Sequence, residues 1–390
     1  MTRPRALFVN AGFLGHASVA RLVRQAVGGR PEIEASHLDL SAALTPGERV
    51  VRRVMCAGPR GAGAFPGAAL LLPRFRHELH AGVLAARRIR ALEAAGGRFD
   101  AIHFHTQATA WGSLRRMRRT PCIVSIDATQ RLASAEAGSA VERLDYAAPA
   151  AMDRRVFAAA AAIVSTSRWA ADDLLRGQPE CAGRLHVLPY PVALEGFGAE
   201  WPAERAARAG ADPRAPVRVL FVGGDFPRKG GFELLRAWRE GGLHPHASLT
   251  LVTDWPLDAA ALPPGVSLRR GVRACSDDWL AAWRSADLFA MPTRGEAFGM
   301  VFQEAAAAGL PAVGTRLNAI PEIVAHGETG LLVPPGDAGA LAEALRALVA
   351  SPATRRRMGT AARARIERTG SVAAYGARLA ALVREVAGDG

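Results

Sequence analysis

Two glutamates and one lysine form the pattern with the clearest chemistry. Glu296 and Glu304 stand eight residues apart in "RGEAFGMVFQEAAAAGLP", and Lys229, the only lysine of 390 residues, stands in "PRKGGFE". A helix that begins near Phe298 would place Glu304 in its second turn and Glu296 just before its first. Across continuous helix the two would be about 12 Å apart, more than the roughly 5 to 9.5 Å between the paired carboxylates of glycoside hydrolases. The spacing therefore favours two separate contacts with one elongated ligand.

A sugar nucleotide is a ligand of that shape, because it has hydroxyl groups at both ends and a diphosphate between them. Carboxylates accept strong hydrogen bonds from hydroxyl groups. The N–H groups that open the helix, beside Phe298, would meet the diphosphate at the positive helix end. They belong to Gly299, Met300 and Val301.

Residues 286–337 resemble the C-terminal domain of the retaining glycosyltransferases of family 4. The E-x7-E element of that family is matched in "EAFGMVFQE", and matches to "EAxAxGxPxV" and "GxxGLLVPP" follow. The resemblance is close over residues 217–350 and looser in the first half, where it rests on "DAIHFHTQ" and "AAAAIVSTSRWAADDLL". It implies an α/β chain with the GT-B fold, in which two facing Rossmann-like domains with parallel sheets enclose a cleft.

The same resemblance implies a hexosyltransferase that takes a sugar from a UDP- or GDP-sugar with retention of configuration, by front-face attack. Glu296 would bind hydroxyls of the donor sugar and Glu304 the ribose, whereas Lys229 would hold the diphosphate. The family's second cation is absent, because Gly223, Gly224 and Asp225 occupy its region. Arg228 is the nearest replacement. For Glu304, Lys229 and Arg228 the alternative is a solvated side chain, and for Glu296 it is a helix N-terminal glutamate that complements the helix dipole.

Two cations would stabilise the charge that grows on the departing diphosphate, so we expect neither a metal nor another cofactor. Gly224 is expected to line the donor site. "RRGVRAC" resembles the loop that holds the base, with Arg270 and Val272 lining it.

The first half offers a weaker set of candidates. Gly12 and Gly15 in "NAGFLGHAS" would let the backbone approach the diphosphate, or form only a tight turn. His103 and His105 stand two residues apart at a strand end. The resemblance assigns His105 to the donor sugar; a core or surface histidine is the alternative for His105 and the preferred interpretation of His103. Asp127 in "SIDATQ" would orient an acceptor hydroxyl or, as we prefer, cap the following turn.

Short apolar strands alternate with helical stretches, which is typical of parallel sheets covered by helices. The rhythm stops at residues 195–215, which we interpret as a linker, and then restarts. We predict an acceptor domain over 1–200, a donor domain over 201–370, and a C-terminal helix over 371–390 that bridges to the first domain. Residues 57–68 are predicted to form a mobile loop. Strands are predicted at 6–12, 100–106, 122–129, 161–167, 217–225, 248–254, 287–293, 311–315 and 329–335.

The amino-acid composition excludes several classes of protein. Apolar residues make up 49% and charged residues 22%, as in soluble globular proteins. No apolar run approaches the roughly 20 residues that cross a bilayer, and four scattered cysteines indicate neither zinc nor disulfides. We therefore expect a cytoplasmic protein.

The net charge of +13 is concentrated in residues 1–190, which hold 26 Arg and 15 Asp or Glu, hence +11. The Arg-rich segments 73–90 and 111–119 suggest peripheral contact with anionic membrane, or simply solvated helix faces.

Three other functions fit the sequence less well. A sugar-nucleotide epimerase or a phosphorylase would share the fold, but a phosphorylase needs a lysine for pyridoxal phosphate and the only lysine is already assigned. A nucleic-acid binder would rest on the charge alone, since aromatic residues make up only 6% and no recognition motif appears.

Overall fold

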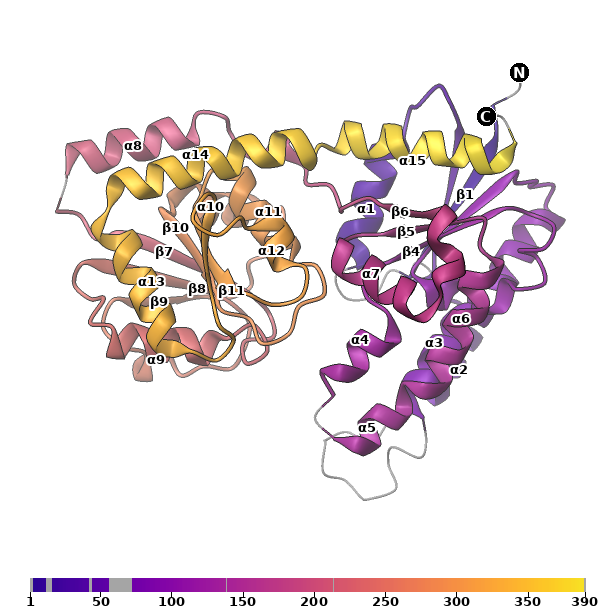
Figure 1. Ribbon diagram of the computed structural model, residues 1–390, viewed down its shortest axis with the longest axis horizontal. Helices are drawn as coiled ribbons and strands as arrows, with labels where there is room; N and C mark the ends of the chain where they lie inside the picture. Colours follow the sequence, from indigo (N-terminus) through magenta and orange to yellow (C-terminus); the bar gives the residue numbers. More distant parts are fainter. Residues whose placement is uncertain are drawn as a thin grey trace. The chain divides into compact units, whose positions relative to one another are not determined.

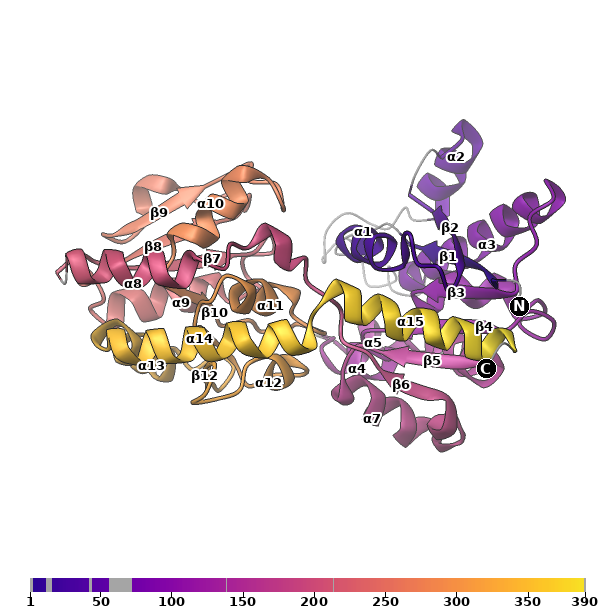
Figure 2. The same ribbon diagram turned by 90° about the horizontal axis from the view of Figure 1, so that it is seen from above.

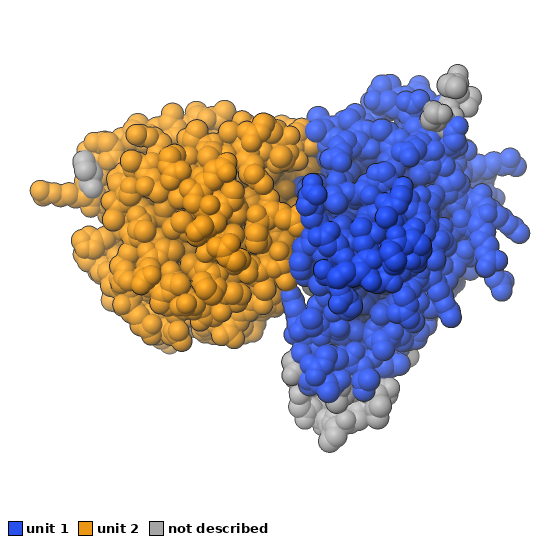
Figure 3. Space-filling model, viewed as in Figure 1, with its two compact units in different colours: residues 1–190, 372–390 blue, residues 191–371 orange. Residues whose placement is uncertain are grey.

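The computed structural model describes residues 3–11, 16–41, 44–55, 72–137, 139–212 and 214–388. These fold into two compact units (Figure 1). Unit 1 comprises Met1–Tyr190 and Val372–Gly390, and unit 2 comprises Pro191–Ser371 (Figure 3). The chain thus passes into unit 2 after residue 190, and its last segment returns to unit 1. The predicted loop over 57–68 lies outside the described residues.

Unit 1 is built on a parallel six-stranded sheet with the order β2-β1-β3-β4-β5-β6. Four of its strands fall where apolar runs predict them. The strands β2 and β6 are not predicted, because both lie at sheet edges, are only partly buried, and therefore need no apolar run. The strands are β1 Arg5–Asn10, β2 Glu34–Asp39, β3 Ala101–His105, β4 Cys122–Ile126, β5 Ala162–Ser165 and β6 Leu185–Val187.

Unit 2 repeats this architecture with the order β12-β11-β10-β7-β8-β9, again parallel. The sequence predicts every strand here except β9, which is also a partly buried edge strand. The strands are β7 Val217–Val222, β8 Ala247–Val252, β9 Val266–Arg269, β10 Leu288–Met291, β11 Ala312–Thr315 and β12 Gly330–Val333.

The predicted C-terminal helix is α15, which belongs to unit 1 and packs along α1 (Figure 2). Arg30, just after α1, donates from Nε to the carbonyl of Ala26 at 2.8 Å and from Nη2 to the carbonyl of Ala373. The helical elements of unit 1 are α1 His16–Val27, α2 Pro46–Met55, α3 Pro73–Ala94, η2 Gln107–Ser113, α4 Gln130–Ala135, α5 Ala140–Asp145, α6 Ala147–Ala159, α7 Arg168–Gly177, η3 Pro179–Arg184 and α15 Val372–Ala387.

The segment interpreted as a linker is largely helical, so that interpretation was wrong. It contains α8, which packs on unit 2 through the buried ring of Trp201. Arg205 donates to the carbonyls of Ala286, Ala308 and Gly309 at 2.6, 3.0 and 3.2 Å. Burial lowers the pKa of Arg205 to about 10. Because α8 is anchored partly by the polar contacts of Arg205, its sequence lacks the apolar periodicity by which a helix is predicted.

The helical elements of unit 2 are η4 Leu194–Gly196, α8 Trp201–Ala211, α9 Gly231–Glu240, η5 Ala259–Ala261, α10 Asp277–Ser285, α11 Met300–Ala307, α12 Ile320–Ile323, α13 Ala338–Ala350 and α14 Pro352–Thr369. An aromatic cluster fixes α11 on the sheet. The Phe302 ring of α11 packs edge-on against the Phe289 ring of β10, with ring centroids 5.5 Å apart. The ring centroids of Phe289 and Trp283 are 5.2 Å apart. Burying a side chain such as Phe302 contributes roughly 1.5 to 3 kcal/mol, which holds the start of α11 at one edge of the sheet.

Candidate functional site

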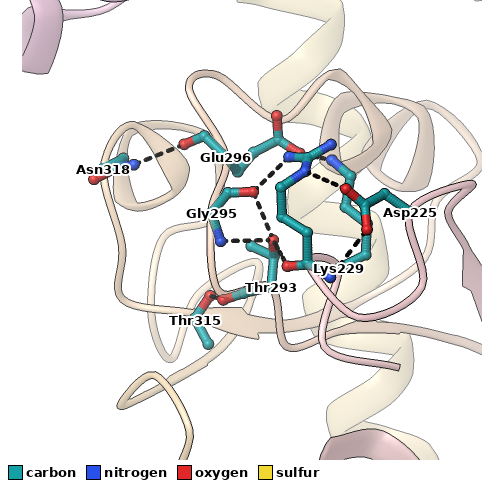
Figure 4. A network of polar contacts seen from close by, with 8 residues as sticks. Asp225, Lys229, Thr293, Gly295, Glu296, Thr315 and Asn318 are labelled. Atoms are coloured by element: carbon teal, nitrogen blue, oxygen red, sulfur yellow. Dashed lines mark hydrogen bonds and ion pairs between the residues drawn. The ribbon is translucent and has the colours of Figure 1, made fainter. Parts of the chain in front are cut away.

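Two predicted donor residues of unit 2, Lys229 and Glu296, lie together in a network of polar contacts at the carboxyl edge of its sheet (Figure 4). The strands β7, β10 and β11 are neighbours and parallel, so the loops that follow them meet at one edge. These loops span residues 223–230, 292–299 and 316–319. In open α/β sheets this edge is where ligands bind.

Lys229 and Glu296 form an ion pair in this site, although 67 residues separate them. Each side chain is only 15% exposed. Two glycines let the backbone pass close to this lysine. A Cβ on Gly223 would lie 3.0 Å from Cγ of Lys229, and one on Gly230, at φ 74°, would lie 1.9 Å from the carbonyl oxygen of Pro292. The "KG" pair thus has a physical reason, because only glycine fits beside this lysine.

Arg228 lies next to Lys229 in the chain and is held by Asp225. Asp225 stands in the region where the family usually has its second cation. Arg228 donates from Nε to Oδ2 of Asp225 at 2.9 Å and from Nη1 to the carbonyl of Gly295 at 2.7 Å. A guanidinium has five N–H groups, so three remain beyond these two bonds. Asp225 and the carbonyl of Gly295 therefore fix Arg228 in place, and three of its donors remain for a ligand.

Three polar residues that the sequence did not single out hold the Glu296 loop. Thr293 Oγ1 lies 3.0 Å from the carbonyls of Arg228 and Gly295 and has one proton to share between them. Thr315 Oγ1 donates to the carbonyl of Thr293 at 2.7 Å, and Asn318 Nδ2 donates to the carbonyl of Glu296 at 3.0 Å. Their only sequence signal is that each follows or ends an apolar strand.

The helix α11 begins at Met300, with Gly299 at φ 93° as its N-cap. Glu304 lies in its second turn and is half-buried, whereas Glu296 lies in the preceding loop. The separation of about 12 Å assumed continuous helix, and that assumption was wrong because residues 296–299 are not helical. Of the helix-start residues, Phe298 is buried and Val301 packs against the core.

The predicted base loop follows β9, farther along the same edge. Arg270 donates from Nη2 to the carbonyl of Leu257 at 2.5 Å, and the N–H of Gly271 donates to Oδ1 of Asp254 at 2.7 Å. Val272 packs against the core. Gly224 is exposed in the loop after β7, whereas Gly12 and Gly15 lie outside the described residues.

Unit 1 pairs His105 with a residue that the sequence did not indicate. His105 Nε2 lies 2.7 Å from the hydroxyl of Tyr190, which follows β6, and both side chains are buried. Burial raises the pKa of the Tyr190 hydroxyl, and the negative charge of Asp127 raises it further. Tyr190 therefore keeps its proton beside the imidazole.

The other two candidates of unit 1 differ in their surroundings. His103 is buried, lies 2.7 Å from Oγ of Ser125, and has its pKa lowered to about 3 by burial, as a neutral core histidine would. Asp127 is half-buried at the end of β4. The preferred role of Asp127 as a cap was wrong, because α4 begins at Gln130 and Thr129 caps it, accepting from the N–H of Leu132 at 3.2 Å.

The basic segments 73–90 and 111–119 are partly occupied by internal contacts. Arg88 pairs with Glu48 at 2.8 Å, and Arg116 pairs with Glu93. Within the described ranges, no helix is long and apolar enough to cross a bilayer. Nor do three His, Cys, Asp or Glu side chains there gather as metal ligands.

Comparison with known proteins identifies the family of the chain. The family model described as Glycosyltransferase Family 4 matches residues 44–195, and the model described as Glycosyl transferases group 1 matches residues 216–351. A D-inositol 3-phosphate glycosyltransferase from Pseudarthrobacter chlorophenolicus is 30% identical over 315 residues, which cover 75% of this chain and 72% of that protein.

Solved structures show the same fold. A sucrose-phosphate synthase from Thermosynechococcus elongatus has a TM-score of 0.69 at 21% identity, with 100% of both chains covered. Anabaena Alr3699/HepE in complex with UDP-glucose has a TM-score of 0.66 at 16% identity, covering 98% of this chain and 100% of that one. The fold is GT-B, and the chain belongs to the family 4 glycosyltransferases.

Proposed function

We propose that this glycosyltransferase takes its sugar from a nucleotide-sugar donor and transfers it with retention of configuration. The observation that carries the proposal is the Lys229–Glu296 pair at the start of α11, where one cation and one hydrogen-bond acceptor stand side by side. The cation would bind a diphosphate, and the acceptor would bind a sugar hydroxyl. UDP-glucose is the first donor to test, because it is the ligand named for the Anabaena structure.

In this proposal each residue acts at a definite bond. Lys229 and Arg228 stabilise the diphosphate as the glycosidic C–O bond breaks. Glu296 accepts hydrogen bonds from hydroxyls of the sugar, and Glu304 accepts from the ribose. The acceptor oxygen attacks from the face that the diphosphate leaves, and its proton passes to the departing phosphate oxygen, so no metal or other cofactor takes part.

In the same proposal, His105 of unit 1 would contact the donor sugar and Asp127 would orient the acceptor hydroxyl. The acceptor itself is open to a lipid-linked, polysaccharide or small soluble hydroxyl compound. Contact with anionic membrane belongs to the same proposal, and its support is a set of exposed arginines. These are Arg87, Arg115, Arg118 and Arg119. Flotation with anionic but not neutral vesicles would support this contact, and equal behaviour with both would remove it.

The first experiment is a thermal-shift series with UDP, GDP and ADP and their glucose conjugates. A ligand that binds only the folded state raises the melting temperature. UDP release is then measured with and without a panel of sugar, polyol-phosphate and lipid-linked hydroxyl acceptors. We expect release to depend on the acceptor, whereas equal release without one would favour the epimerase alternative.

The variant Glu296→Gln separates donor binding from transfer. It removes the carboxylate that neutralises Lys229, so UDP should bind at least as tightly as in the wild type. Transfer should nevertheless fall at least a hundredfold, because the amide accepts sugar hydrogen bonds less strongly. Unchanged transfer would contradict the role of Glu296, and Glu343→Gln on the exposed face of α13 is the matched control.

A further inference from the structure

Unit 2 contains a cavity of about 790 Å³ at the edge of the sheet opposite to the donor site. Its lining includes Val217, the first residue of β7, His246, just before β8, and Asp287, just before β10. Amino ends of parallel strands gather at one edge, so this cavity and the Lys229 site lie at opposite edges of the sheet. Ligand pockets in proteins usually measure about 300 to 1,000 Å³, so a molecule of nucleotide size fits.

Positive charge dominates the lining. Five arginines and two aspartates face the cavity, which gives 5 − 2 = +3. The arginines are Arg208, Arg214, Arg218, Arg346 and Arg355, and the aspartates are Asp212 and Asp287.

Two of the arginines are engaged within the fold. Arg208 Nη2 pairs with Oδ1 of Asp287 at 2.6 Å. Arg355 Nη1 donates to the carbonyls of Leu348 and Val349 at 2.5 and 2.8 Å, in the last turn of α13. Cations at a helix C-terminus complement its negative end, so these two charges have a structural use.

The other three arginines have no such use. In the part of the chain that the structure describes, the side chains of Arg214, Arg218 and Arg346 form no hydrogen bond or ion pair, and all three are exposed. Asp212 accepts at 3.0 Å from the N–H of Arg214, not from its guanidinium. Three uncommitted guanidinium groups at one cavity indicate an anionic ligand.

The start of α14 adds to this potential. Pro352, its first residue, lines the cavity, and the N-cap Ser351 accepts from the N–H of Thr354 at 3.2 Å. The ends of α8 and α13 and the start of α14 lie together on the left side of unit 2 in Figure 1. The positive end of an 18-residue helix therefore faces the same space as the three arginines.

The cavity also has an apolar floor, formed in part by Val217, Leu243 and Val349. An inorganic anion would use only the charged rim. We propose that the cavity binds a phosphate-bearing small molecule of nucleotide size. Its phosphate lies against Arg214, Arg218 and Arg346, and its apolar body rests on the floor. The site is separate from the donor site and is independent of the proposed donor chemistry.

The test uses the full chain, with AMP and inorganic pyrophosphate as probes. Calorimetry measures affinity, and hydrogen–deuterium exchange locates protection. We expect saturable AMP binding, with protection at residues 214–219 and 352–356. AMP should bind more tightly than pyrophosphate, since only AMP covers the apolar floor.

The double variant Arg218→Gln with Arg346→Gln should weaken AMP binding at least tenfold and leave UDP affinity unchanged. Arg239→Gln with Arg368→Gln removes the same charge at exposed positions elsewhere on unit 2 and should leave AMP affinity as in the wild type. The proposal is overturned if the wild type shows no saturable AMP binding, if the double variant binds AMP as the wild type does, if pyrophosphate binds as tightly as AMP, or if protection falls only around Lys229.

Discussion

Exchanging Lys229 for arginine keeps the charge of the donor site and changes its shape. The ammonium is paired with Glu296, both side chains are 15% exposed, and Gly223 leaves only 3.0 Å between a Cβ position and the lysine stem. A guanidinium is planar and can engage both oxygens of a carboxylate. Lys229→Arg should therefore tighten the resting pair with Glu296 and withdraw the cation from the diphosphate.

The magnitude follows from the hydrogen bond that is lost. A hydrogen bond to a charged group contributes about 1.5 to 3 kcal/mol, which corresponds to roughly 10-fold to 150-fold in the dissociation constant of UDP. The loss in turnover should be larger, about 10²-fold to 10³-fold, because the diphosphate gains charge in the transition state.

Calorimetry with UDP and steady-state release of UDP from UDP-glucose measure the two effects. Thermal melting checks that the variant is folded, and Arg239→Lys makes the reverse exchange at an exposed position of α9. If Lys229→Arg retains kcat/KM and UDP affinity within about threefold of the wild type, the assignment of the lysine to the diphosphate is wrong.

Three further outcomes follow from the structure. Glu304→Gln should weaken UDP binding about tenfold in calorimetry without lowering the melting temperature, because it loses a charged acceptor for the ribose. Gly230→Ala should lower the melting temperature by several degrees relative to Gly224→Ala, because its Cβ would lie 1.9 Å from a carbonyl oxygen, whereas one on Gly224 meets nothing within 4 Å. Burial, then the charge of Glu78, raises the pKa of Asp153 to about 7, so the native state binds a proton that the unfolded chain releases from about pH 4. The stability that this group contributes falls as the pH rises from about 4 to 7. The melting temperature of Asp153→Asn, relative to that of the wild type, should therefore be higher at pH 8 than at pH 5. An equal difference at both pH values would contradict this pKa.

The local pattern of the sequence was sufficient for the central strands and for the C-terminal helix α15. Most residues of each central strand are buried, so the strand is largely an apolar run, and apolar runs are visible without a structure. The edge strands β2, β6 and β9 carry polar residues because one side meets solvent, and they were missed. The helix α8 was missed for a related reason, since Arg205 anchors it by polar contacts.

The sequence by itself determined which residues could do chemistry in unit 2, because Lys229, Gly230, Glu296 and Glu304 stand in a characteristic local pattern. Only the tertiary structure decided how they combine. The ion pair between Lys229 and Glu296 spans 67 residues, and the contact between His105 and Tyr190 spans 85. The ion pair depends on β7 and β10 lying side by side, and the second contact depends on where the chain runs after β6. Both are set by the packing of whole helices and sheets, which no local spacing encodes.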